Sequence, residues 1–218
     1  MTNVDLRLYG LIDPQIARGR SLAELTLAAV AGGTTLIQYR DKNTDTRTMI
    51  ERARSIKQAL TGTGVPLLIN DRIDVAIAAG ADGVHIGQDD MHAGDARAIL
   101  GRNAIIGLTV NNNENAGEAL RLPVDYACIG GVFPTGSKDN PKAPIGLGGL
   151  SNLLEILRQG RPHMPAGAIA GITLENAASV IAAGSDGIAV ISSLFSTDNV
   201  SATASALRAA VDAALQKR

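Results

Sequence analysis

Short, almost entirely apolar runs alternate with longer Ala- and Leu-rich runs along the whole chain. The short runs have the length and composition of β-strands, and we predict strands at residues 6–12, 35–40, 66–70, 83–87, 104–110, 125–130, 167–171 and 187–192. The longer runs have helical character, most clearly at residues 46–62, 94–101, 174–184 and 201–218. Strands that are apolar on both faces are typical of a parallel sheet covered by helices.

Eight strands alternating with eight helical intervals predict an α/β fold, a closed (β/α)8 barrel. No linker or low-complexity stretch divides the chain, so we expect residues 1–218 to form a single domain. An open doubly wound sheet is the structural alternative, although the chain has no G-x-G-x-x-G turn after its first strand.

One segment of the chain echoes another. AAGADGVHIGQ at residues 78–88 resembles AAGSDGIAVIS at 182–192, and each follows a strand and a helix. A half-barrel repeat explains the echo, because equivalent helix-to-strand turns need the same turn chemistry. The A-G-x-D-G pattern is also simply a good helix stop. Both explanations concern architecture and neither bears on function.

The composition excludes several classes of protein. Lys and Arg number 20 against 21 Asp and Glu, and aromatic residues are three Tyr, two Phe and no Trp. We therefore expect no nucleic-acid partner and no membrane partner. A single cysteine, Cys128, rules out an internal disulfide, and the N-terminal residues lack the pattern of a secretory signal. We expect a soluble, cytoplasmic protein; a homo-oligomer is compatible with the sequence.

Acidic side chains follow two neighbouring predicted strands. Asn70 and Asp71 end the third strand, and Gln88, Asp89 and Asp90 follow the fourth. The residues just past the strand ends of such a barrel share one mouth, and adjacent strands lie roughly 5 Å apart. Two carboxylates placed in this way suit Mg²⁺, which takes one or two carboxylates together with substrate phosphate oxygens. The alternative is a helix N-cap at Asp71 and a solvated turn at Asp90.

The stretch QYRDK, residues 38–42, ends the second predicted strand. Because side chains alternate along a strand, Gln38, Arg40 and Lys42 project to one side and Tyr39 and Asp41 to the other. Arg offers a planar fork for phosphate and Lys adds a point charge, so this side is expected to bind an anion. The alternative is a solvated strand end at which Arg40 or Lys42 merely pairs with a nearby Asp.

Two further stretches suit anions. PTGSK, residues 134–138, lies in the longest irregular segment, 133–149, and its hydroxyls, Gly and Lys can surround a phosphate. AGIT at 170–173 and ISS at 191–193 follow the last two strands, where barrels of this type often bind phosphate. In AGIT, Gly171 permits close backbone approach, whereas Thr173 is equally a helix N-cap.

Other reactive side chains have ordinary explanations. Cys128 is expected to be a small core residue, His85 a hydrogen-bonded structural histidine, and His92 and His163 loop residues. The chain contains no H-E-x-x-H, C-x-x-C or G-x-S-x-G motif. An acidic pair combined with several anion-binding stretches predicts a diphosphate substrate with Mg²⁺ and a second, phosphorylated substrate. The chemistry most in keeping is departure of pyrophosphate, whose developing charge the cations would stabilise.

With these residues in view, the chain resembles the thiamine-phosphate synthase (thiamine-phosphate pyrophosphorylase) family over nearly its whole length. The matching segments, in order, are LIQYRDK, INDRIDVAIAAGADGVHIGQDDM, IIGLTV, DYACIGGVFPTGSK, AIAGITLENA and GIAVISSLF. The resemblance implies a TIM barrel that joins 4-amino-5-hydroxymethyl-2-methylpyrimidine diphosphate to a thiazole phosphate, giving thiamine monophosphate and pyrophosphate. It also implies a dissociative mechanism, in which pyrophosphate leaves and the thiazole nitrogen captures a pyrimidine carbocation.

The resemblance also implies roles for individual residues. The pyrimidine diphosphate would be held by Gln38, Tyr39, Arg40, Asp41, Lys42, Asn70, Thr109 and Lys138, of which Arg40, Lys42 and Lys138 would be catalytic. The thiazole phosphate would be held by Thr135, Gly136, Ser137, Gly171, Ile191 and Ser192. Asp71 and Asp90 would bind Mg²⁺.

The chain departs from the family pattern at four places. The usual P-T-x-T-K reads PTGSK with Ser137, the usual Ser reads Thr109, and the usual G-G-I has Ala170 before Gly171, while VNNNENA after Thr109 is unlike the common sequence. Two rival functions use the same barrel: a thiazole tautomerase-like isomerase, and a catalytically silent phosphate-binding or regulatory protein. The presence of the cations and of both acidic residues favours the synthase.

Overall fold

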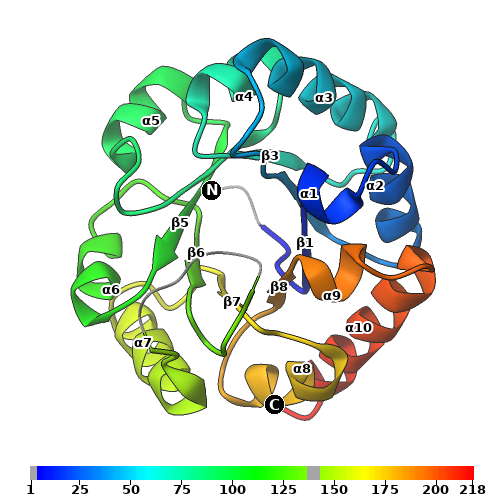
Figure 1. The fold of residues 1–218 in the computed structure, drawn as a ribbon. Coiled ribbons are helices and arrows are strands. Elements are labelled where there is room, and N and C mark those ends of the chain that lie inside the picture. Colours follow the sequence, from blue (N-terminus) through cyan, green and yellow to red (C-terminus); the bar gives the residue numbers. More distant parts are fainter. Residues whose placement is uncertain (1–3, 137–142) are drawn as a thin grey trace.

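The computed structural model, which describes residues 4–136 and 143–218, is a closed barrel of eight parallel strands in sequence order (Figure 1). The strands are β1 (Leu8–Ile12), β2 (Leu36–Tyr39), β3 (Leu67–Asn70), β4 (Gly83–Ile86), β5 (Ile105–Val110), β6 (Tyr126–Ile129), β7 (Ala166–Ile169) and β8 (Ile188–Val190). β8 pairs with β1 in the register Leu8 to Ile188, which closes the ring. The predicted (β/α)8 barrel is confirmed and the open sheet is excluded.

Helices surround the strands. Those in the described part of the chain are α1 (Pro14–Ala17), α2 (Leu22–Ala31), α3 (Thr46–Ala59), α4 (Ile73–Ala79), α5 (Ala93–Leu100), α6 (Asn113–Ala119), α7 (Gly146–Gly160), α8 (Leu174–Ala182), α9 (Ser192–Phe195) and α10 (Val200–Leu215). The four helices predicted most clearly are α3, α5, α8 and α10. The four-residue helices α1 and α9, which follow β1 and β8, were not anticipated.

Among the predicted boundaries that differ in the structure, three lie at the C-terminal ends of strands or in the loop after β6. The strand expected at 167–171 ends at Ile169, because Ala170 and Gly171 adopt the left-handed conformation, with φ of 90° and 65°, and turn the chain away. The strand expected at 187–192 ends at Val190, and Ser192 already begins α9. Helix α7 begins at Gly146, inside the segment 133–149 that was expected to be irregular.

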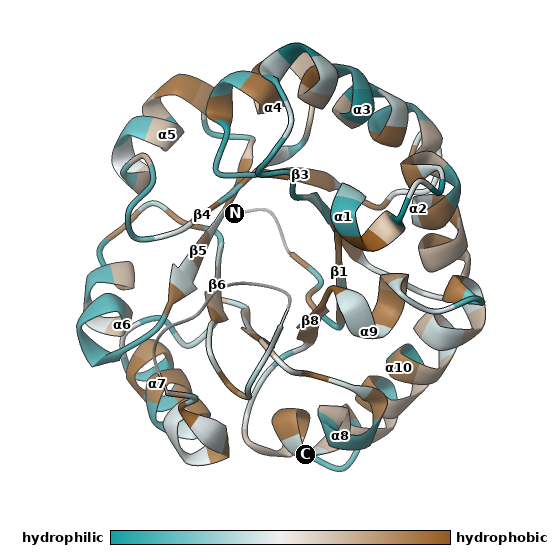
Figure 2. Ribbon diagram, in the orientation of Figure 1, coloured by the Kyte–Doolittle hydropathy of each residue, from teal (hydrophilic) through white to brown (hydrophobic). Residues whose placement is uncertain are grey.

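Apolar side chains form two layers. The larger layer lies between the strands and the helices, and includes Leu8, Ile37 and Tyr39. The smaller one fills the barrel interior with side chains that alternate with these along the strands, such as Tyr9 and Leu36, together with Val4 and Leu6 from the segment before β1. The strands are mainly hydrophobic, whereas the outer helices carry both hydrophobic and hydrophilic positions (Figure 2). Within the described residues, no helix is long and apolar enough to cross a membrane.

An acidic residue before each of three even-numbered strands braces the N-terminal end of the barrel. The carboxylates of Asp82, Asp125 and Asp186 accept the backbone N–H of Leu67, Ile106 and Ala166, respectively, at 2.7, 2.8 and 2.9 Å. Each also pairs with a cation from the helix that precedes the neighbouring odd-numbered strand: Lys57 of α3, Arg97 of α5 and Arg158 of α7, at 2.6, 2.7 and 2.9 Å. The sequence echo at 78–88 and 182–192 therefore marks two copies of a repeated brace, and Asp125 supplies a third without the A-G-x-D-G pattern.

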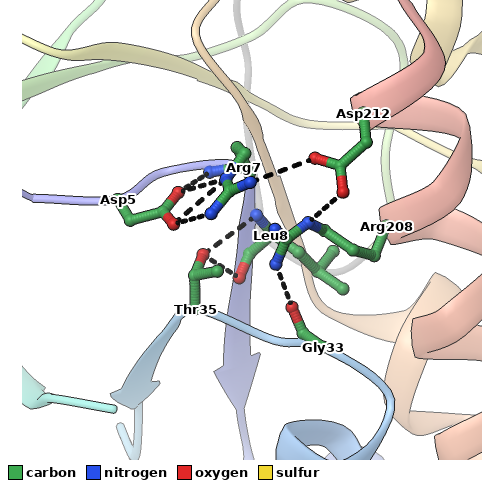
Figure 3. Close-up of polar contacts among 7 residues, drawn as sticks. All are labelled: Asp5, Arg7, Leu8, Gly33, Thr35, Arg208 and Asp212. Atoms are coloured by element: carbon green, nitrogen blue, oxygen red, sulfur yellow. Dashed lines mark hydrogen bonds and ion pairs between the residues drawn. The ribbon is translucent and has the colours of Figure 1, made fainter. Parts of the chain in front are cut away.

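The brace between β1 and β2 uses a hydroxyl in place of a carboxylate (Figure 3). Thr35 Oγ1 accepts the N–H of Leu8 at 3.1 Å and donates to its carbonyl at 3.0 Å. Arg208 of α10 donates to the carbonyl of Gly33 at 2.9 Å and to Asp212 at 2.8 Å, and Asp212 also meets Arg7 at 3.4 Å. These contacts tie the last helix to the first strand and to the loop before the second.

Replacing Asp125 by Ala should lower the free energy of unfolding by about 2–4 kcal/mol, because it leaves the Ile106 N–H and the partly buried Arg97 without their carboxylate. Asp74→Ala is the matched control: it removes a carboxylate that pairs with Arg72 at the surface and should cost less than about 1 kcal/mol. Urea unfolding of both variants measures the difference. Equal decreases in the free energy of unfolding would show that the brace stabilises the barrel no more than a surface ion pair does.

Candidate active site

A cavity of about 720 Å³ lies at the C-terminal ends of the strands. Every strand contributes to it directly or through the loop that follows. Its lining residues include Tyr9, Gln38, Arg40, Asn70, His85, Asp89, Thr109, Asn111, Cys128, Thr135, Gly136, Gly171, Thr173, Ile191 and Ser192. Nine of these were site residues in the sequence analysis: Gln38, Arg40, Asn70, Thr109, Thr135, Gly136, Gly171, Ile191 and Ser192. Ser137 and Lys138 lie outside the described residues.

The end of β2 presents its side chains in the predicted alternation. Gln38 is 1% exposed and turns into the barrel, where its amide meets the hydroxyl of Tyr9. Tyr39 turns the other way, into the layer beneath the helices, and donates to Asp41 at 2.7 Å, while Arg52 of α3 holds the same carboxylate at 2.9 Å. Tyr39, Asp41 and Lys42, which were predicted to bind substrate, are not among the residues that line the cavity. Burial, followed by the Asp41 carboxylate, raises the pKa of Tyr39, which keeps this phenol protonated.

Arg40 lines the cavity but also has a protein partner, Asp13, at 2.5 Å. Asp13 follows β1 and caps α1, accepting the N–H of Gln15 at 2.9 Å with its other oxygen. A guanidinium has five N–H donors in a planar fork, so this ion pair fixes its orientation while further donors face the cavity. Sequence reasoning missed Asp13, although the Asp-Pro pair just after a strand is a signal for a helix start.

The acidic pair is brought together as predicted. Asp71 has a left-handed backbone, with φ of 61°, and its N–H donates to the carbonyl of His85 on β4 at 2.9 Å. Its carboxylate accepts from Asn70 at 2.7 Å and from Lys42. Asp71 is not a helix cap, because α4 is preceded by Arg72, which makes no side-chain cap bond. The N-cap alternative for Asp71 is therefore excluded.

Asp90 faces Asp71 from the loop after β4. One of its oxygens accepts the N–H of Gly87 at 2.7 Å, which closes that loop. Burial, together with the adjacent Asp71 carboxylate, raises the pKa of Asp90, and the Lys42 ammonium opposes this only in part. Two carboxylates that disfavour each other in this way are stabilised by a bound cation.

The donor set of this pair fits a hard divalent cation. Carboxylate oxygens are the protein ligands Mg²⁺ prefers, and it usually takes one or two of them. The Lys42 ammonium already rests on Asp71, so the position attracts positive charge. In the described part of the chain no three His, Cys, Asp or Glu side chains come together as a metal cluster, so a cation here would complete its shell with water or with oxygens of a ligand.

The wall formed after β7 and β8 depends on close backbone packing. Any side chain at Gly171 would strike the loop after β6, because a Cβ there would lie 2.7 Å from Phe133 Cβ and still closer to the Pro134 carbonyl. Asn176 fixes the turn by donating to the Gly171 carbonyl and accepting the Thr173 N–H, both at 2.9 Å. Gly171 was expected to permit close approach of a ligand; in the structure it also permits close approach of residues 133–134, of which Pro134 lines the cavity with Thr135.

The cavity floor contains a polar group that the sequence analysis did not assemble. Tyr9 and Tyr126 join their hydroxyls at 2.8 Å deep in the barrel, and His85 links Tyr126 to Thr109 at 2.8 and 2.9 Å. His85 is thus the hydrogen-bonded structural histidine that was expected, but it lies in the cavity wall. Cys128 is a buried core residue as predicted, and burial raises the pKa of its thiol to about 12, which makes it a poor nucleophile at neutral pH.

A closed (β/α)8 barrel with cations and an acidic pair at its C-terminal mouth defines an enzyme of the TIM-barrel class. The sequence profile of the family described as Thiamine monophosphate synthase matches residues 8–194. The thiamine-phosphate synthase of Agrobacterium fabrum is 56% identical over 218 residues, covering 100% of this chain and 99% of that protein. That of Chloroflexus aurantiacus is 45% identical over 214 residues, covering 98% and 96%.

Among solved structures, the thiamine phosphate pyrophosphorylase of Pyrococcus furiosus superposes with a TM-score of 0.86 at 36% identity, and 98% of each chain is covered. The chain belongs to the thiamine-phosphate synthase family, whose members are transferases.

The two residues after β7 should respond in opposite directions to small substitutions. Ala170→Gly should raise the free energy of unfolding by about 0.5 kcal/mol, because relief of a left-handed alanine outweighs the added freedom of the unfolded chain. Gly171→Ala should lower it by about 2–4 kcal/mol and weaken activity, since the new methyl displaces residues 133–134. Denaturant unfolding compares the two, and a stable Gly171→Ala variant would contradict the packing argument.

Asp90→Asn should stabilise the metal-free protein at neutral pH. The folded-state pKa of Asp90 is raised above its ordinary value of 3.8, so ionisation costs stability as pH rises through the folded-state pKa. The neutral amide avoids that cost and can still accept from Gly87. Urea unfolding in EDTA should therefore show a gain that grows as the pH rises above about 4 and levels off once the pH exceeds the folded-state pKa of Asp90. Asp95→Asn, an exposed carboxylate on α5, is the control; a similar gain there would point to general charge effects.

Proposed function

We propose that the chain couples 4-amino-5-hydroxymethyl-2-methylpyrimidine diphosphate with thiazole phosphate to give thiamine monophosphate and pyrophosphate, with Mg²⁺ as cofactor. The single observation that carries this reading is that Lys42 meets the acidic pair Asp71–Asp90 at the ends of β2, β3 and β4, directly beside the cavity that Arg40 lines. A diphosphate needs both cationic donors and a shared divalent ion, and these residues supply the first and the ligands for the second.

The diphosphate is assigned to the side of the mouth built by β2, β3 and β4. Arg40, held by Asp13, presents its remaining donors to the phosphate oxygens. Lys42 pairs with Asp71 and has a half-exposed side chain that can move from the carboxylate to an arriving phosphate. Asn70 donates to the same oxygen of Asp71. Bound Mg²⁺ would lie on Asp71 and Asp90 and would stabilise charge that develops on the departing pyrophosphate.

The thiazole phosphate is assigned to the opposite wall, after β6, β7 and β8. This wall consists of Thr135, Gly136, Gly171, Ile191 and Ser192, which combine hydroxyls with closely packed backbone. Ser137 and Lys138 continue the same loop in the sequence and, by resemblance, complete the phosphate site and contact the diphosphate. Substrates on two walls of one cavity meet with their reacting atoms between them, which is how binding lowers the entropic part of the barrier.

The chemistry proposed is dissociative. Pyrophosphate leaves the pyrimidine methylene carbon with the bonding electron pair, and the thiazole nitrogen then donates its lone pair to the resulting carbocation. Arg40 and Lys42 stabilise the leaving group as its charge grows, which is the step at which fixed cations act most effectively. The protein needs no nucleophile of its own, in keeping with the buried Cys128, whose thiol stays protonated.

The rival functions make different demands on this cavity. A thiazole tautomerase-like isomerase needs a phosphate site and a proton shuttle, but neither the acidic pair nor the cations of β2. A silent phosphate-binding protein needs no arrangement in which two carboxylates face each other at a cost in stability. The retention of Arg40, Lys42, Asp71 and Asp90 at one edge favours the synthase over both.

The deciding experiment measures pyrophosphate release and thiamine monophosphate formation by the purified protein, omitting each substrate and Mg²⁺ in turn. We expect both products in equal amounts, and only in the complete mixture. Asp71→Ala and Asp90→Ala should each lower the rate at least about 100-fold while the protein stays folded, because the metal ligands are lost. Asp74→Ala, an exposed carboxylate on α4, should leave the rate unchanged. Full activity in both metal-site variants would refute the metal assignment, and absence of products from the wild type would refute the synthase.

A further inference from the structure

A continuous chain of polar side chains crosses the barrel interior beneath the cavity. It runs from Gln38 on β2 to Tyr9 on β1, then to Tyr126 on β6, His85 on β4 and Thr109 on β5. Three of its links are 2.8, 2.8 and 2.9 Å, and the fourth joins the Gln38 amide to Tyr9. All five side chains except Thr109 are buried, with Tyr126 fully inaccessible.

The barrel is built to hold this chain. Gly107 on β5 leaves the space that the Tyr126 phenol occupies, because a Cβ at Gly107 would collide with that ring. The rings of Tyr9 and Tyr126 meet edge to face, with centroids 5.9 Å apart. Burial raises the pKa of both phenols, so each keeps its one proton.

The number of protons allows only two consistent directions of hydrogen bonding. Each phenol donates once, and a neutral imidazole has one N–H and one bare nitrogen. If the Gln38 NH2 donates to Tyr9, then Tyr9 donates to Tyr126, Tyr126 donates to His85 Nδ1, and His85 Nε2–H donates to Thr109. In the opposite direction Thr109 donates to His85 Nε2, His85 Nδ1–H to Tyr126, and Tyr126 to Tyr9, and Tyr9 donates to the Gln38 carbonyl oxygen once that amide group has rotated by half a turn. A mixed arrangement leaves either a buried O–H or N–H without an acceptor, or the two phenol oxygens facing each other with no proton between them, and an unpaired buried group costs about 1–3 kcal/mol.

Both ends of the chain reach the cavity. Gln38 and Thr109 line it from strands three apart around the ring. With the Gln38 NH2 on Tyr9, Gln38 Oε1 has no hydrogen-bond partner among the described residues although it is buried at the cavity wall. In this direction one wall offers an acceptor, and Thr109 on the other wall has its own hydroxyl proton to give.

We infer that Tyr9, Tyr126 and His85 are positioning residues that couple the hydrogen-bonding state of Gln38 to that of Thr109, so that the cavity takes a ring bearing an N–H donor and a ring-nitrogen acceptor. An aminopyrimidine has this pair of groups. The inference deepens the proposed function, from which the identity of the ring is taken. In this role the tyrosines act through Gln38 and Thr109, by fixing which way these two side chains present their donors.

The direct test uses the tautomer of His85, read from imidazole ¹⁵N chemical shifts in the ligand-free protein. The protein has only three histidines. The other two, His92 and His163, are exposed and serve as reference signals. The wild type should carry the His85 proton on Nε2. Gln38→Glu replaces the donor by a carboxylate that can only accept, and Arg40 two residues on favours its ionised form. The direction of every hydrogen bond in the series should then reverse. This moves the His85 proton from Nε2 to Nδ1, three hydrogen bonds away from residue 38.

The matched control removes the Tyr9 hydroxyl, and so interrupts the hydrogen bonds between position 38 and His85. In the double variant Tyr9→Phe with Gln38→Glu, the proton should stay on Nε2, because Tyr126 then donates to His85 whatever occupies position 38. A single Gln38→Glu variant that keeps the wild-type tautomer would overturn the inference. A double variant that still switches would also overturn it, since the effect would then bypass Tyr9.

The kinetic test separates positioning from general stability. Tyr9→Phe should raise the KM for the pyrimidine diphosphate about tenfold while leaving the KM for thiazole phosphate unchanged, since one wall loses its fixed donor direction. Ile105→Val, an apolar change in the same barrel interior, should leave both constants unchanged. Equal changes in the two KM values, or none, would contradict the inference. A wild type that forms no thiamine monophosphate would refute the proposed function, and the tautomer experiment would still decide the coupling.

Discussion

Closure of the sheet by the backbone pairing of β8 with β1 is the constraint on which the rest of this protein depends. Without it the ends of β2, β3 and β4 would not face those of β6, β7 and β8 across one cavity. Backbone pairing alone does not fix how far each strand slides along its neighbour. The repeated braces at the N-terminal end do this, because a carboxylate or hydroxyl before each even-numbered strand is bonded to the backbone of the strand before it.

The two ends of the barrel therefore carry different kinds of side-chain interaction. At the N-terminal end, carboxylates such as Asp125 pair with cations and accept backbone N–H groups, so their charges are compensated. At the mouth, Asp71 and Asp90 face each other, and the pKa of Asp90 is raised. Asp71 and Ala170 also hold left-handed backbone there. Local strain and like charges thus gather at the mouth, where a bound cation would relieve the repulsion, and the braced end supplies the stability that tolerates them.

The interior of the barrel adds a second departure from a purely apolar core. A chain of two phenols and an imidazole inside a barrel is stable only when every donor finds an acceptor. Because of that requirement, the hydrogen-bonded side chains behave as a unit. The series reaches the cavity at both ends, through Gln38 and Thr109. A core that would otherwise only support the strands thus influences what the cavity recognises.

The sequence by itself determined the order and type of the elements, the barrel, the family and most of the cavity wall. Strand runs apolar on both faces and the two-residue alternation of QYRDK were enough, because burial and strand geometry act locally along the chain. The alternation also placed Tyr39 and Asp41 opposite Gln38, and only the family resemblance had added them to the site. What tertiary structure alone decided were contacts between distant residues: Asp13 on Arg40, Gly171 against Phe133, and the link from Tyr9 to Tyr126, 117 positions apart. No local pattern encodes these contacts, since they exist only once eight strands are closed into one ring and their inward side chains compete for the same interior.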